Sequence, residues 1–174
     1  VDTLAALHRL EPDAVGLADY GKAGNYFARQ VGRWTKQYRA SEIEPIGAMD
    51  RLIAFLPESL PPEGPTRIVH GDFRLDNLIL DPAEAKVRAV LDWELSTLGD
   101  PMADFSYLLI AWVIPASLRN GLAGADLEAL GIPSVAETVE RYAQKTGTAA
   151  PTNLDWLFAY NLFRLAAICQ GIGA

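Results

Sequence analysis

Apolar residues recur at helical spacing through the first third of the chain. Residues 1–10 place leucines on one face, and residues 27–38 repeat large apolar side chains every three or four positions with basic residues between them. Residues 45–56 form a third candidate helix, and the proline-rich segment 57–65 should end it and act as a connector. This part of the chain is therefore predicted to be helical.

The centre of the chain has a different pattern. Short apolar runs at residues 68–70, 78–80 and 87–91 are typical of strands, and the turn-prone residues 81–84 separate the last two. The pattern predicts three short strands, two of which form a hairpin.

Helical signals return after the predicted strands. Asp100 before Pro101 has the form of an N-cap followed by proline at the first helical position, and Pro115 should end that helix. Residues 135–146 form the next candidate helix, and residues 154–168 carry an apolar pattern that reaches almost to the end of the chain. The predicted fold class is α+β, mostly helical, with a small β region at its centre.

Composition limits the kinds of partner. A chain of 174 residues with 50% hydrophobic and 21% charged residues suits one globular domain, residues 1–174. A net charge of −7 disfavours nucleic acid and anionic membrane as partners. Cys169 has no partner for an internal disulfide, and no apolar run is long enough for a membrane span. We therefore expect a cytoplasmic protein without a membrane segment.

Acidic and amide side chains gather around the predicted strands. Asp72 and Asn77 lie in a polar loop between two apolar runs, and Asp92 follows the run that the hairpin should carry back beside Asn77. One carboxylate and one amide oxygen are hard ligands of the kind that Mg²⁺ prefers. Asp72 would lie one loop-width away, where it could accept a proton from a hydroxyl group while phosphate charge is neutralised. The sequence therefore indicates phosphoryl transfer.

The motifs carry a resemblance to a known family. His-Gly-Asp-x-x-x-x-Asn at residues 70–77, then Leu-Asp-Trp-Glu at 91–94 and Gly-Asp-Pro-x-x-Asp at 99–104, resemble the aminoglycoside phosphotransferase and choline kinase-like families, which are relatives of protein kinases. The branch most similar is the one whose domain is fused to acyl-CoA dehydrogenases, and the resemblance covers nearly the whole chain. It implies the fold of a protein-kinase-like C-terminal lobe.

The resemblance also implies roles. It makes Asp72 the catalytic base, Arg74 a contact to the transferred phosphate, and Asn77 and Asp92 the residues that bind Mg²⁺ and, with it, the co-substrate ATP. The supporting residues would be His70, which would orient the loop, Asp100, which would cap the next helix and brace the loop backbone, and Glu94, which could reach a metal-bound water. Trp93 is expected in the core, and Asp104 in a structural role at the start of a helix.

Other parts of a kinase are missing from the sequence. No glycine-rich phosphate loop is present, and no lysine lies in a Val-Ala-Ile-Lys-like strand. We therefore expect a C-terminal lobe, truncated at both ends, that binds ATP weakly and is inactive by itself. The face left open by the missing lobe should expose apolar surface and favour self-association.

The substrate and two alternative functions stay open. The family name suggests aminoglycosides as the small-molecule hydroxyl substrate, whereas the most similar branch suggests a hydroxyacyl thioester or another metabolite. One alternative function is a non-catalytic, pseudokinase-like binding module. A metal-dependent phosphoesterase ranks lower, because His8 and His70 are the only histidines available as nitrogen ligands for a second metal.

Overall fold

The computed structural model describes residues 1–173. The helices of this part of the chain are α1 (Asp2–His8), α2 (Tyr26–Ala40), α3 (Gly47–Glu58), α4 (Pro101–Leu109), α5 (Val135–Thr146) and α6 (Leu154–Gly173). The strands are β1 (Arg67–Val69), β2 (Leu78–Leu80), β3 (Val87–Val90) and β4 (Thr97–Gly99). The fold is thus mostly helical with a small β region, as the sequence predicts.

The strands form two separate antiparallel pairs. β1 pairs with β4, with Arg67 opposite Gly99, and β2 pairs with β3, with Leu78 opposite Val90. The β2–β3 hairpin is the predicted one. Strand β4 is not predicted from the sequence, because three residues are too few to show an alternating pattern. The β1–β4 pair holds the chain segment before the polar loop against the segment after the hairpin.

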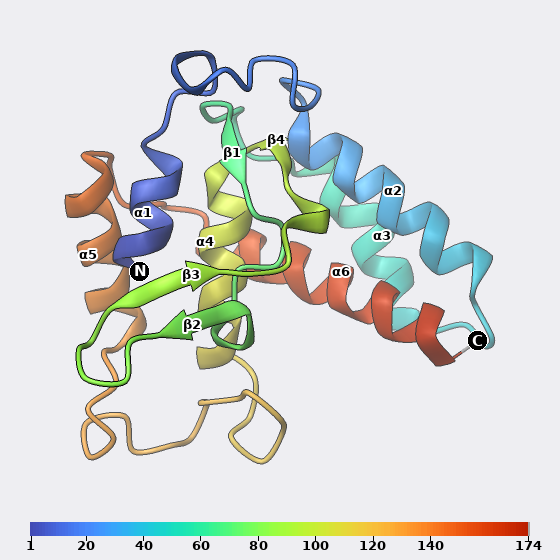
Figure 1. Ribbon diagram of the computed structural model, residues 1–174. Helices are drawn as coiled ribbons and strands as arrows, with labels where there is room; N and C mark the ends of the chain where they lie inside the picture. The colour runs from blue at the N-terminus through green and yellow to red at the C-terminus, as the bar shows by residue number, and fades with distance from the viewer. Residues whose placement is uncertain (174) are drawn as a thin grey trace.

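Two hydrophobic clusters support these strands. One is built mainly from α2, α3 and α6, and the other mainly from α1, α4 and α5. In Figure 1, α2, α3 and α6 lie on one side of the β region and α1 and α5 on the other, with α4 between them. Met102 of α4 and Leu154 of α6 pack against both clusters. The strands and the loops that join them are therefore set between two packed helical groups.

Local signals in the sequence determine several helix ends. Ser134 and Glu137 form a reciprocal capping box at the start of α5, and Gly147 ends that helix with a φ of 74°. Asp100 caps α4 by accepting a hydrogen bond from the Met102 backbone at 2.8 Å, and Pro101 occupies the first helical position. These ends agree with the predictions from sequence.

The structure differs from the sequence predictions at three places. α3 includes Pro57 and ends at Glu58, since a proline in the last turn removes only one helical hydrogen bond. α4 ends at Leu109 and continues as a short 3₁₀-helix, well before Pro115. The prediction that Trp93 belongs to the core is wrong, because its side chain is 40% exposed. Within residues 1–173, no helix is both long and apolar enough to cross a membrane.

Candidate functional site

The polar loop after β1 is held by buried hydrogen bonds to its backbone. Asp104, at 1% exposure, accepts one hydrogen bond from the His70 amide at 2.5 Å and another from the Gly71 amide at 2.8 Å. Ser96 donates its hydroxyl to the Val69 carbonyl at 2.8 Å. Hydrogen bonds to an ionised carboxylate are stronger than neutral ones, so Asp104 fixes the start of the loop firmly.

Asp104 is itself supported by a buried polar chain. Nε2 of His8 lies 3.4 Å from one Asp104 carboxylate oxygen, and Nδ1 of His8 lies 2.6 Å from the Tyr142 hydroxyl. Burial is the main cause that raises the pKa of Tyr142, and the Asp104 carboxylate adds to the effect. Helices α1, α4 and α5 therefore all contribute to the position of the loop.

His70 connects the loop to the end of β3. Its side chain is completely buried, its Nε2 donates to the Leu91 carbonyl at 2.8 Å, and its Nδ1 accepts from the Asp72 amide at 3.1 Å. These two bonds require the neutral tautomer with the proton on Nε2. The ring of Trp93 lies 4.7 Å from that of His70, centroid to centroid, so the partly exposed Trp93 packs against the buried His70 ring.

Asp72 and Asn77 are paired within the loop. The amide nitrogen of Asn77 donates to both the Asp72 carboxylate and the Asp72 backbone carbonyl, each at 2.9 Å. Nε of Arg74 lies 3.3 Å from the same carboxylate, and another Arg74 nitrogen lies 3.2 Å from Asp76. The Arg74 side chain is 45% exposed, so its charge is placed at the loop surface next to Asp72.

Asp92 follows directly after the strand that pairs with β2. The Leu91 amide donates to the Asn77 carbonyl at 2.8 Å, which brings the backbone before Asp92 against the end of the loop. Asp92 has a φ of 63° and a ψ of 60°, a left-handed conformation that is uncommon for residues other than glycine, asparagine and aspartate. Such strained positions cluster at functional sites. Asp92 and Glu94 are both exposed, and Glu94 lies in the 3₁₀-helix Trp93–Leu95.

The donor set of the loop fits a magnesium ion better than a softer metal. Asn77 uses its amide nitrogen to bind Asp72, so its side-chain oxygen is the atom available to a cation. Mg²⁺ is commonly bound by one or two carboxylates together with phosphate oxygens and water. Residues 1–173 hold no group of three or more His, Cys, Asp and Glu side chains suited to a metal. The predicted magnesium ligands are of a different kind, because they are one amide, from Asn77, and one carboxylate, from Asp92.

Tyr107 of α4 is a neighbour of Asp72 that sequence reasoning missed. Burial raises the pKa of Tyr107 to about 12, and the Asp72 side chain contributes by hydrogen bonding and by its charge. A tyrosine in an apolar helical run gives no sign that its hydroxyl faces a polar loop. Asp104 was expected only as a structural helix residue, and only the folded structure shows that it binds the loop backbone.

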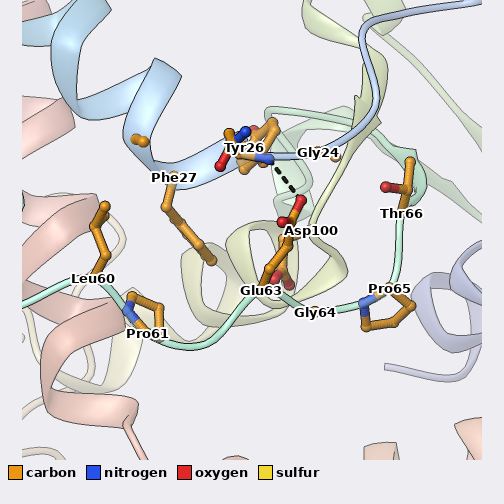
Figure 2. A pocket seen from close by; sticks show the side chains of 13 residues that line it. Gly24, Tyr26, Phe27, Leu60, Pro61, Glu63, Gly64, Pro65, Thr66 and Asp100 are labelled. Atoms are coloured by element: carbon orange, nitrogen blue, oxygen red, sulfur yellow. Dashed lines mark hydrogen bonds between the residues drawn. The ribbon is translucent and has the colours of Figure 1, made fainter.

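Asp100 does not brace the loop, which corrects that expectation. It lies next to Gly64 of the connector, and burial raises its pKa, with the Glu63 carboxylate adding to the effect. Figure 2 shows Asp100 and Glu63 at a small cavity of about 70 Å³ between the connector and the start of α2. A larger cavity of about 620 Å³ is lined by α1, the connector and the segment 146–153. Neither cavity is lined by Asp72, Asn77 or Asp92.

Comparison with known proteins assigns the chain to a family and a fold. The sequence profile of the Phosphotransferase enzyme family matches residues 1–144. A crystal structure from Ralstonia eutropha, provisionally assigned as an aminoglycoside phosphotransferase, superposes with a TM-score of 0.95 at 51% identity, covering 98% of this chain and 53% of that chain. The fold is that of a kinase-like phosphotransferase. The chain belongs to the phosphotransferase enzyme family.

Curated relatives carry the same kind of domain within longer proteins. The chain is 48% identical over 171 residues to acyl-CoA dehydrogenase family member 10 of Mus musculus, a match that covers 97% of this chain and 16% of the relative. It is 38% identical over 174 residues to acyl-CoA dehydrogenase family member 11 of Homo sapiens, with 99% and 22% covered. The chain thus spans less than a quarter of these relatives.

More distant structures share the fold alone. A Streptomyces rimosus aminoglycoside phosphotransferase, solved with ADP and streptomycin, has a TM-score of 0.57 at 17% identity, covering 94% of this chain and 59% of that chain. An aminoglycoside-3′-phosphotransferase of type VIII has a TM-score of 0.64 at 18% identity, covering 93% and 59%.

Proposed function

We propose that this chain provides the catalytic loop and metal ligands of an ATP-dependent phosphotransferase that acts on a hydroxyl group of a small molecule. The observation that carries the proposal is the bonding of Asp72 to Asn77 within a loop whose backbone is fixed by buried groups. Phosphoryl transfer needs little from a protein beyond positioning and charge neutralisation, and this loop is suited to both.

Asp72 is the base in this proposal. The acceptor hydroxyl gives its proton to the Asp72 carboxylate as its oxygen bonds to the γ-phosphorus of ATP, and the bond from that phosphorus to the bridging oxygen breaks to release ADP. Asn77 limits the rotation of the Asp72 carboxylate through its bond to one oxygen, which leaves the other oxygen for the incoming hydroxyl. Arg74 places positive charge beside the same carboxylate and contacts the transferred phosphoryl group.

Asn77 and Asp92 are the residues that would hold Mg²⁺. When bound, the ion neutralises charge on the phosphates of the nucleotide. The exposed position of Asp92 leaves room for the remaining ligands, and its left-handed backbone turns the chain at the end of β3. His70 supports both parts of the site, because it binds the Asp72 amide on one side and the Leu91 carbonyl on the other. Glu94 is placed close enough in sequence to contact a metal-bound water.

The acceptor is best described as a small molecule with a hydroxyl group. The acidic side chains of α5 and α6 do not single out a cationic aminoglycoside as the acceptor. Glu137 is used in the capping box of α5, Glu140 binds Gln144 of the same helix, and Asp155 lies in the first turn of α6. The proposal therefore allows a hydroxyacyl thioester or another metabolite as the acceptor as readily as an aminoglycoside antibiotic.

The test is an activity screen of the natural protein that contains this chain. ADP release from MgATP would be measured over a panel of hydroxyl compounds that includes aminoglycosides, hydroxyacyl thioesters and sugars. Asp72→Asn should lower kcat by about 10²- to 10⁴-fold, because it removes the general base. Asp126→Asn makes the same chemical change in an exposed turn and should leave kcat unchanged.

Two outcomes would contradict the proposal. Turnover that is insensitive to Asp72→Asn would remove Asp72 from the reaction. Binding of MgATP without turnover of any acceptor would favour the non-catalytic, pseudokinase-like binding module instead.

A further inference from the structure

Arg164 of α6 is a buried cation whose position no ion pair explains. The residue is 6% exposed, and among residues 1–173 no carboxylate lies within ion-pairing distance of its guanidinium group. Its Nε is buried without a hydrogen-bond partner in this part of the chain. An arginine is rarely buried unless it is paired, because a charged group loses favourable hydration when it leaves water. A compensating interaction is therefore expected.

The guanidinium group makes that interaction with the catalytic loop. One terminal nitrogen donates a hydrogen bond to the Gly71 carbonyl. The group also lies over two aromatic rings, 5.0 Å from the ring centre of Tyr107 and 5.6 Å from that of Trp34. Contacts of a cation with ring faces are attractive and become stronger when water is excluded. Arg164 is thus held between two rings with one donor directed at the loop.

The Gly71 carbonyl belongs to the peptide unit that orients Asp72. Arg164 binds the oxygen of this unit, and Nδ1 of His70 accepts from its N–H, which is the Asp72 amide. The unit is therefore held at both ends, and its plane determines where the Asp72 side chain begins. Gly71 has a φ of 86°, and a Cβ there would lie 2.6 Å from the Leu95 carbonyl oxygen, so no other residue fits this turn easily.

Tyr107 lies beside both Arg164 and Asp72. Its ring centre is 5.0 Å from the guanidinium carbon of Arg164, and the Asp72 side chain contributes to the raised pKa of Tyr107. Arg164 binds the loop at the Gly71 carbonyl, whereas Asn77 binds the carbonyl and the carboxylate of Asp72. The peptide between Gly71 and Asp72 and the Asp72 side chain are therefore held by different groups.

We propose that Arg164 is a positioning residue for the phosphoryl-transfer step: it fixes the peptide between Gly71 and Asp72, and with it the point from which the Asp72 side chain extends. This inference rests on the function proposed above. It predicts that loss of the guanidinium group disorders the Asp72 carboxylate without weakening the binding of nucleotide, which depends on Asn77 and Asp92.

The test uses the natural protein and three variants on α6. Arg164→Met removes the charge and all hydrogen-bond donors. Arg164→Lys keeps the charge but lacks the planar guanidinium group. Asn161→Ala is the matched control, since Asn161 is fully buried one turn earlier and donates to Ser106 at 2.8 Å and to Ala103 at 3.4 Å, without contact to the loop. Hydrogen exchange of the Asp72 amide, by NMR or mass spectrometry, reports the loop directly.

Arg164→Met should raise exchange at the Asp72 amide by about tenfold or more while exchange in α2 changes little, since only a local opening is affected. The kcat for hydrolysis of MgATP alone should fall by about a hundredfold, because misplacement of a catalytic group by 1 Å costs this much, while the KM for MgATP stays nearly constant. Arg164→Lys should give intermediate values of both. Asn161→Ala should lower the melting temperature without either effect.

Two results would overturn the inference. One is unchanged exchange at the Asp72 amide in Arg164→Met, and the other is increased exchange with no fall in kcat. If Arg164→Met does not fold, Arg164→Lys decides the matter, because it keeps the buried charge and loses the planar guanidinium group that binds the Gly71 carbonyl. Failure of the proposed function has a different signature, namely a kcat unaffected by Asp72→Asn, and the exchange measurement stands independently of that outcome.

Discussion

Asp104→Asn should strongly destabilise the protein although it changes no atom of the proposed reaction. The two carboxylate oxygens of Asp104 each accept a backbone hydrogen bond, from His70 at 2.5 Å and from Gly71 at 2.8 Å. An asparagine side chain has one oxygen, so one of the two amides would face an N–H group instead. The variant therefore loses one hydrogen bond and leaves a buried donor without an acceptor.

The magnitude follows from these two losses. A hydrogen bond to a charged group contributes about 1.5–3 kcal/mol, and an unsatisfied buried donor costs about 1–3 kcal/mol. The two estimates overlap, so we expect the free energy of unfolding to fall by about 3 kcal/mol. The His8 ring, 3.4 Å from the same carboxylate, would also lose its acidic partner. Because the residue is 1% exposed, water cannot readily replace the missing acceptor.

Urea unfolding followed by circular dichroism measures this change, with the slope m compared between variants to confirm that the two-state description holds. Asp126→Asn is the control, since Asp126 accepts a backbone hydrogen bond from Ala129 at 3.1 Å in an exposed turn. Its effect should stay below about 0.5 kcal/mol. A fall in the free energy of unfolding of less than about 1 kcal/mol for Asp104→Asn would refute the reasoning. It would mean that a buried backbone N–H without an acceptor costs no more than one with an acceptor.

Three further predictions concern single contacts. Ser134→Ala removes the capping box of α5 and should lower the unfolding free energy by about 1 kcal/mol in thermal or urea unfolding. The hydrogen bond from Arg141 holds the pKa of Asp2 at about 2 instead of 3.8, so its stabilisation is complete above pH 3.8 and is lost as the pH falls towards 2. In an NMR titration, Arg141→Met should therefore move the pKa of Asp2 up towards 3.8. The pKa of Tyr107, about 12, should fall part of the way towards 10.0 in Asp72→Asn when followed by ultraviolet absorbance, and an unchanged pKa would show that burial alone raises it.

Several elements of the fold depend on local signals and could be predicted from the sequence. The N-cap at Asp100, the helix over residues 135–146 and the hairpin around residues 81–84 each rest on residues close together in the chain, so pattern and turn chemistry were sufficient to predict them. The spacing of Asp72 and Asn77 also lies within one loop, and their pairing is a short-range consequence of that spacing.

Contacts between residues far apart in the chain could not be predicted from the sequence. Asp104 reaches the loop across 34 positions and Arg164 across 93, and neither distance leaves a periodic or local trace in the sequence. Strand β4 exists because β1 provides hydrogen-bond partners, and the partly exposed Trp93 packs against the buried ring of His70. The chemistry of the loop is thus readable from a few neighbouring residues, whereas the rigidity that the chemistry requires comes from buried groups that only packing brings together.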